Sequence, residues 1–161
     1  MHEDRRRVEK MNEKMVGEPE KIFFAIEQDH SKYPSVSCEQ LWCLPVQTDT
    51  YLIDNIPFYA RDVSIGDEIR TELRDDRRWC ICVTKPSTNT TLRVFARNPI
   101  FEPMLRPRLE SFGGLTEKME GSPLIAVSLP GIADIASALA FLDREYEAGN
   151  VGFEESCVRY R

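Results

Sequence analysis

The sequence predicts an α+β protein with a small β-barrel-like N-terminal half packed with a ferredoxin-like (βαββαβ) C-terminal half. Short segments of alternating hydrophobicity, separated by turn residues, follow one another up to Val83. After Pro86 the rhythm changes, and two segments with helical spacing of apolar residues lie between strand-like segments. The expected division is a mobile charged tail at 1–19, a small barrel or rolled sheet at 20–86 and the ferredoxin-like part at 90–161.

Five short strands are expected in the first half. In the first of them Ile22, Phe24 and Ile26 are spaced by two, which is typical of a strand with one buried face. Turn-forming pairs such as Gly66-Asp67 separate the later strands. The five strands are expected at 21–27, at 36–46 with an interruption at Pro45, at 51–53, at 68–73 and at 79–83.

The second half is expected to alternate strands with two helices. Asn98-Pro99 resembles a helix start, so the first helix either is kinked at Pro107 or begins late, at Pro103. Asp134 is predicted to cap the second helix. The helical stripe that follows consists of Ile135, Leu139, Leu142 and Tyr146, and the strands are expected at 91–97, 115–120, 124–129 and 153–160.

Composition favours a cytoplasmic protein with reduced thiols. The 161 residues carry a net charge of -6. This acidity predicts against nucleic-acid binding, because that affinity comes from neutralising phosphates, and it suits a basic protein partner. No apolar run reaches the ~18 residues of a membrane span, and the N-terminus lacks the apolar segment of a secretion signal. With no export signal, the five cysteines are expected to be free and metal-free.

The tail at 1–19 mixes charges of both signs. Arg5, Arg6 and Arg7 interleave with acidic residues, so the charges nearly cancel. The segment is interpreted as a mobile tail or a frayed helix, with a basic anchor as the alternative.

The sequence lacks the residues that common catalytic and metal-binding sites require. His2 lies in the tail, and His30, in a turn, is expected to be a surface histidine rather than part of a triad. Cys80 and Cys82 are predicted on one face of a strand, as small core residues, whereas structural zinc sites use Cys-x-x-Cys turns. Cys157, also in a strand, is expected in the core. No cofactor and no metal are predicted.

Phosphate-binding and RNA-binding motifs are not evident either. Gly113-Gly114 follows a helix instead of opening one, so it does not form a phosphate loop. Phe95 is the one aromatic residue on the 91–97 strand, which therefore lacks the paired rings of an RNA-recognition motif.

Two polar segments are candidates for a ligand site across the junction of the halves. Segment 54–62 combines an Asp-Asn turn with aromatic and basic residues, and segment 86–93 is rich in hydroxyl side chains. The alternative is that each segment only caps and turns the chain locally, with the arginines neutralising neighbouring carboxylates. The candidate ligand-binding residues are Asp54, Asn55, Phe58, Arg61, Ser87, Asn89 and Arg93.

The same segments carry a family resemblance. The run Asp-Asn-Ile-Pro-Phe-Tyr-Ala-Arg-Asp-Val-Ser-Ile-Gly-Asp-Glu-Ile (54–69), preceded by Glu39-Gln40-Leu41-Trp42 and followed by Thr90-Thr91-Leu92-Arg93-Val94, resembles an uncharacterised bacterial domain of unknown function. The likeness extends from about Lys21 to Cys157, and the tail lies outside it. It implies a bacterial cytosolic origin but brings no activity and no catalytic residues.

Two functions follow from these observations. The first is a non-catalytic binding or interaction module, in one version immunity- or antitoxin-like, that binds a basic protein or a small anionic ligand. The alternative is a small hydrolase or transferase that uses the carboxylate cluster near Asp54–Asp67, with Asp62 and Arg61, since burial can shift a carboxyl pKa into a catalytic range. The sequence does not determine the oligomeric state.

Overall fold

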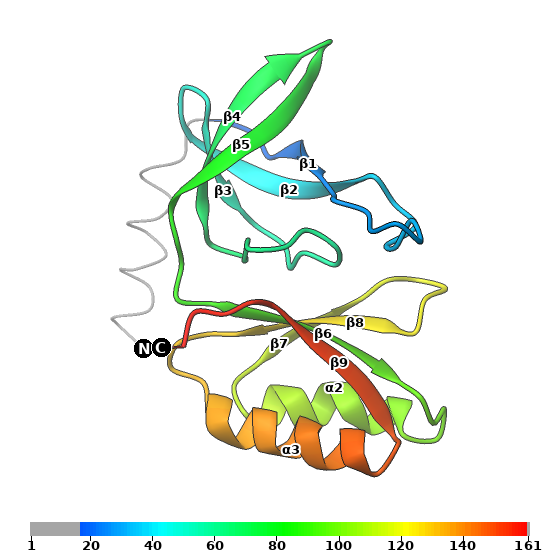
Figure 1. Ribbon diagram of the computed structural model, residues 1–161. Coiled ribbons are helices and arrows are strands. Elements are labelled where there is room, and N and C mark those ends of the chain that lie inside the picture. Colours follow the sequence, from blue (N-terminus) through cyan, green and yellow to red (C-terminus); the bar gives the residue numbers. More distant parts are fainter. Residues whose placement is uncertain (1–16, 161) are drawn as a thin grey trace.

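The computed structural model describes residues 17–160 and consists of two sheets and two helices. Figure 1 shows the two sheets stacked one above the other, with both helices on the far side of the C-terminal sheet. The α+β class and the β-rich first half are confirmed. Most of the predicted tail lies outside the described residues. No described helix is long and apolar enough to span a membrane.

The N-terminal sheet is a meander of five strands. Neighbours pair antiparallel, and β5 pairs back in parallel with β1 through Trp79 and Phe23, so the hydrogen-bonded order closes on itself. Alternate side chains point inward and form one apolar core of Ile22, Phe24, Leu41, Cys43, Tyr51, Ile53 and Ile69 with their neighbours. The strands are β1 (Glu20–Ala25), β2 (Cys38–Gln47), β3 (Thr50–Ile53), β4 (Glu68–Arg74) and β5 (Arg77–Lys85).

A bulge in β5 corrects the prediction for its cysteines. The pairing with β4 shifts register so that Thr71 opposes Cys80 and Arg70 opposes Cys82, which leaves Ile81 as an extra residue. Cys80 therefore packs against the inner core, and Cys82 is exposed. The two thiols do not share a face as strict alternation predicts.

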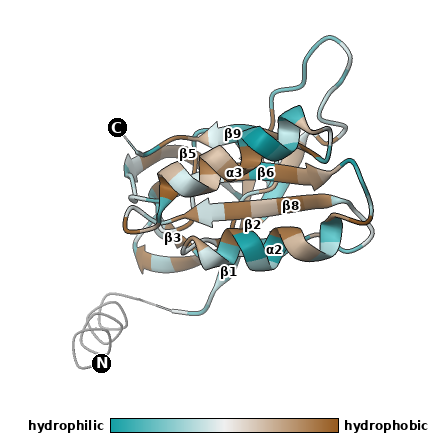
Figure 2. Ribbon diagram, turned by 90° about the horizontal axis from the view of Figure 1, so that it is seen from below, coloured by the Kyte–Doolittle hydropathy of each residue, from teal (hydrophilic) through white to brown (hydrophobic). Residues whose placement is uncertain are grey.

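The C-terminal sheet has the order β7-β8-β6-β9, with every neighbouring pair antiparallel. Viewed from the helix side, α2 and α3 lie across this sheet, and β8 is hydrophobic along most of its length (Figure 2). The buried core between helices and sheet includes Leu92, Val94, Leu105, Leu109, Ile125, Val127, Leu129 and Leu142. The elements are β6 (Thr90–Ala96), α2 (Glu102–Ser111), β7 (Leu115–Lys118), β8 (Leu124–Leu129), α3 (Ile135–Glu147) and β9 (Val151–Cys157).

Prolines and capping side chains determine where the two helices begin. Helix α2 begins late, at Glu102, with a proline in its first turn and Pro107 inside it. Asn98 does not cap this helix; its side chain instead accepts the amide of Ile100 at 3.2 Å in a short turn. Asp134 caps α3 as predicted, because its carboxylate accepts the amide of Ser137 at 3.1 Å.

Candidate functional site at the junction of the sheets

The loop between β3 and β4 (54–67), here called the junction loop, lies between the two sheets (Figure 1). Its side chains Ile56 and Phe58 are buried against Ala126 of β8. Half-buried Tyr59, Ile65, Met119 and Leu124 complete this small apolar cluster. The loop therefore covers the face of the C-terminal sheet that the helices leave open.

Glu39 of β2 holds the middle of the junction loop. Its buried carboxylate accepts the amides of Phe58 at 2.7 Å, Tyr59 at 2.9 Å and Ala60 at 2.8 Å. Three successive N–H groups aimed at one carboxylate form a concave anion-binding nest. In this protein the anion is a side chain of the chain itself, so the nest serves the fold.

Glu117 of β7 reaches the start of the same loop from the other sheet. One of its oxygens accepts the amide of Ile56 at 3.2 Å. Burial raises the pKa of the Glu117 carboxyl above its ordinary value, while hydrogen bonds from Ile56 and the Asn55 side chain oppose that rise. The junction loop is thus held by one carboxylate from each sheet.

Asp67, at the end of the junction loop, joins three segments. Its side chain is fully buried. The carboxylate accepts the amides of Ser64 at 2.9 Å and Ser87 at 2.7 Å, and it lies 3.0 Å from a guanidinium nitrogen of Arg159. These contacts supply donors to the buried carboxylate in place of solvent.

Ser87 and Asn89 converge on one carbonyl of the junction loop. The Ser87 hydroxyl and the Asn89 amide donate to the oxygen of Ile65 at 2.9 and 2.7 Å. Gly66, with φ +85°, lies directly beneath them, and a Cβ there would be 3.2 Å from the Asn89 amide nitrogen. Segment 86–93 is therefore packed on the turn that precedes β4.

Arg93 lies at the centre of the sheet face that meets the loop. Its side chain is 3% exposed and lies 3.1 Å from Glu154, at an angle that makes an ion pair without a hydrogen bond. A second guanidinium nitrogen donates to the Ser156 hydroxyl at 3.1 Å, and that hydroxyl donates to the carbonyl of Ala60 at 3.2 Å. Burial lowers the pKa of Arg93, and Glu154 opposes this. Arg61, which is exposed, reaches the same Glu154 at 3.5 Å.

The structure divides the sequence-predicted site residues among four groups of contacts. Arg61 and Arg93 meet at Glu154, so the carboxylate that they share is neither Asp54 nor Asp62. Ser87 and Asn89 meet at the Ile65 carbonyl. Asp54 and Asn55 contact the backbone of Trp42 at 2.8 and 2.7 Å, and Phe58 belongs to the apolar cluster with its amide on Glu39.

Sequence reasoning missed Glu39, Glu117 and Glu154. A signal existed for Glu39, because it occupies the inward-facing position that Leu41 and Cys43 continue along β2. A carboxylate at such a position requires buried donors. For Glu117 and Glu154 no comparable signal exists, since the partner of Glu117 is set by how the two sheets stack and that of Glu154 by the pairing of β6 with β9.

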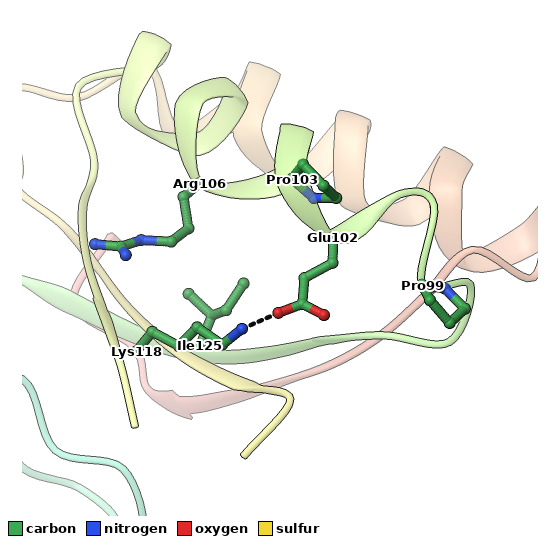
Figure 3. Close-up of a pocket in the computed structure, with 6 residues that line it drawn as sticks. All are labelled: Pro99, Glu102, Pro103, Arg106, Lys118 and Ile125. Carbon is green, nitrogen blue, oxygen red and sulfur yellow. Dashed lines mark hydrogen bonds and ion pairs between the residues drawn. The ribbon is translucent and has the colours of Figure 1, made fainter. Parts of the chain in front are cut away.

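Pockets also open on the surface of the described residues. One, of about 320 Å³, lies beside the junction loop and is lined by Ala25, Ile26, Glu27, Tyr59, Arg61 and Asp62. Another, of about 290 Å³, lies between α2 and β7, where Glu102 pairs with Lys118 and the Arg106 side chain points away from that pair (Figure 3). Over residues 17–160, no group of three or more His, Cys, Asp or Glu side chains is arranged to hold a metal ion.

Comparison with known proteins gives two matches. A family model described as a domain of unknown function (DUF4265) matches residues 39–153. The chain is also similar to a solved structure described as a novel crystal structure of a hypothetical protein from Neisseria gonorrhoeae. The TM-score is 0.72 at 21% identity, over 88% of this chain and 98% of that chain, which shows a shared fold. No curated protein matches the chain.

Proposed function

Since the chain belongs to the domain of unknown function family DUF4265, we propose its function from the chemistry of its own residues. The protein is a non-catalytic binding module that contacts its partner through the outside of the N-terminal sheet. The observation that carries this proposal is that the carboxylates at the junction are committed to the fold. Glu39 accepts hydrogen bonds from three amides, and Asp67 from two amides and an arginine. Such buried, hydrogen-bonded groups stabilise a scaffold and are not presented to a substrate.

The architecture supports a scaffold role. We assign β6 to β9 to the ferredoxin-like class, which the element order and the sheet order β7-β8-β6-β9 support. We assign the N-terminal half to small barrels, which the β1–β5 pairing supports. In this proposal the ferredoxin-like half and the junction loop fix the barrel, and the barrel presents the binding surface.

The alternative enzyme would use carboxylates between Asp54 and Asp67. Asp67 is fully buried and is bound by the Ser87 amide and Arg159, so it is not placed to contact a substrate. Asp54 is the remaining candidate base, because its side chain reaches solvent and the protein around it still raises its pKa by desolvation. A raised pKa alone does not make a base without a positioned nucleophile.

The binding surface is a set of outward-facing side chains, here called the outer face: Lys21 and Phe23 of β1, Trp42 of β2, and Arg77 and Trp79 of β5. Trp42 is 48% exposed. Interfaces are enriched in tryptophan, other aromatic residues and arginine, which is why this surface is chosen over the pockets. The basic partner predicted from the sequence rested on net charge, which averages over the whole surface.

The test uses the immobilised full chain and extract from its source organism. Molecules retained by the wild type should be lost with Trp42→Ala and kept with Tyr146→Ala, which removes a ring of similar exposure on α3. A parallel panel of chromogenic esters, phosphoesters and glycosides should show no turnover. Turnover that Asp54→Asn abolishes and Trp42→Ala leaves intact would replace this proposal with the enzyme.

A further inference from the structure

The aromatic rings of the outer face lie on three adjacent strands. The Phe23 and Trp79 rings are 5.1 Å apart between centroids, on directly paired residues of β1 and β5. On the other side of β1, Lys21 is paired with Trp42. Side chains of β1 alternate between the two faces, and Ile22 points into the core, so these rings point outward.

Cations lie over these rings. The Lys21 ammonium is 5.2 Å from the centre of the Trp42 ring, and the Arg77 guanidinium is 5.4 Å from that of Phe23. Within residues 17–160 neither Lys21 nor Arg77 forms an ion pair. Their charge is therefore available to a ligand.

Neighbouring β4 extends the positive character of this surface. Arg70 and Arg74 alternate with the buried Ile69 and Thr71, so they point to the same side as Trp79. Glu72, which lies opposite Trp79, is paired with Arg74. The local charge of the outer face is thus opposite in sign to the net charge of -6.

We infer that the outer face binds single-stranded nucleic acid. This inference rests on the proposed function and names its partner. Bases stack on aromatic rings regardless of sequence, and phosphates pair with the flanking cations. A duplex hides the faces of its bases, so it could use only the cations. An acidic polypeptide without aromatic or apolar side chains would likewise use the cations, and only a ligand with flat rings would also stack on Phe23, Trp42 and Trp79. The sequence predicts against nucleic acid from the net charge, which conceals this local arrangement.

Fluorescence anisotropy of the full chain with labelled oligouridylate and oligodeoxythymidylate of about 12 nucleotides tests this directly. Trp42→Ala and Trp79→Ala should each weaken binding about tenfold, the loss of one stacked base. Lys21→Ala should weaken binding and reduce its dependence on salt concentration. Because Trp79 also packs against Phe23, Trp79→Ala could act through folding. Trp79→Phe keeps an aromatic ring at this position and should bind more tightly than Trp79→Ala, which separates the loss of base stacking from a loss of folding.

The control is a second ring–cation pair on the other half of the protein. Arg97 lies 5.2 Å from the centre of the Tyr146 ring, so Tyr146→Ala and Arg97→Ala should leave oligonucleotide affinity unchanged. Equal binding of a duplex would overturn the inference, because the rings would then contribute nothing, and equal binding of poly-glutamate would overturn it in favour of an acidic protein partner. Absence of oligonucleotide binding, with Trp42-dependent capture from extract intact, would also overturn it and would leave the binding module standing.

Discussion

The carboxylate of Asp67 and the guanidinium of Arg159 are 3.0 Å apart, although 92 residues separate them in the chain. This pair joins the turn before β4 to the segment after β9, and so it links the two halves of the protein. Because Asp67 is fully buried, that arginine and two amides take the place of water around its carboxylate. The stability of the junction should therefore depend on this pair.

Asp67→Asn should lower the free energy of unfolding by about 2–4 kcal/mol, because it leaves the Arg159 guanidinium and the Ser64 and Ser87 amides without their carboxylate acceptor. Chemical denaturation measures this loss. Arg159→Met should cost a similar amount, and the double variant should cost less than the sum of the two. Fully additive losses in the double-mutant cycle would show that the two residues do not act as a pair.

Glu117 should make stability depend on pH in a defined direction. Its pKa is raised in the folded protein, mainly by burial, so the native state binds the proton more tightly than the unfolded state does. Its contribution is therefore complete below its ordinary pKa of 4.5 and is lost as the pH rises through the folded value. As the pH rises from below 4.5, urea unfolding should show the wild type losing stability relative to Glu117→Gln. A gain in stability of the wild type relative to the variant would mean that the pKa of Glu117 is lowered, and not raised, in the folded protein.

Core positions on α3 should differ in their sensitivity. Leu142 is fully buried in the C-terminal core. Leu139, which is predicted from the sequence to share that core, is half-buried and packs against the core. Leu142→Ala should cost about 2–5 kcal/mol by urea unfolding, and Leu139→Ala clearly less. Equal costs would mean that α3 is rotated about its axis relative to the sheet.

Periodicity in the sequence was enough to predict most elements, because strands and helices with one buried face repeat at fixed spacings. The bulge at Ile81 was not predictable in this way, since it depends on how β5 pairs with β4. The same limit explains the site. Ser87 and Asn89 were chosen as polar residues at the junction, but their partner, the Ile65 carbonyl, follows only from the folded turn.

The partners of Arg93 and Arg77 could not be predicted from neighbouring residues in the sequence. Arg93 appears in the sequence as a candidate for a ligand clamp or for neutralising a carboxylate of the junction loop. Its partner is Glu154 on β9, an adjacent strand whose pairing is set by the whole sheet. Likewise, Lys21 and Arg77 are ordinary charged residues in sequence and form one surface with Trp42 only because β5, β1 and β2 are neighbours.

The cysteines should react with a thiol reagent in the order of their exposure. Cys82 is exposed, whereas burial raises the pKa of Cys43 above its ordinary value and that of Cys80 to about 12. In the native protein a chromogenic disulfide should therefore modify Cys82 first, and Cys82→Ser should remove the fast phase. Elemental analysis is expected to find no zinc, and one zinc per chain would contradict the prediction of free, metal-free thiols.

Gly66 should be more sensitive to substitution than another glycine with a similar backbone. Both Gly66 and Gly121 have positive φ, +85° and +74°, so alanine costs about 1–2 kcal/mol at either position for conformation alone. At Gly121 a new Cβ meets nothing within 4 Å, but at Gly66 it lies 3.2 Å from the Asn89 amide nitrogen and 3.3 Å from the Ser87 Cβ. Gly66→Ala should therefore also displace the two side chains that bind the Ile65 carbonyl.

The two effects separate in one comparison. Chemical denaturation should show Gly121→Ala losing only the conformational cost and Gly66→Ala losing about 1–2 kcal/mol more, the contribution of the displaced hydrogen bonds. In the background Ser87→Ala/Asn89→Ala, those hydrogen bonds are already absent, and the extra cost of Gly66→Ala should shrink towards that of Gly121→Ala. If the extra cost persists unchanged in that background, the contact between segment 86–93 and the junction loop does not explain why residue 66 is glycine.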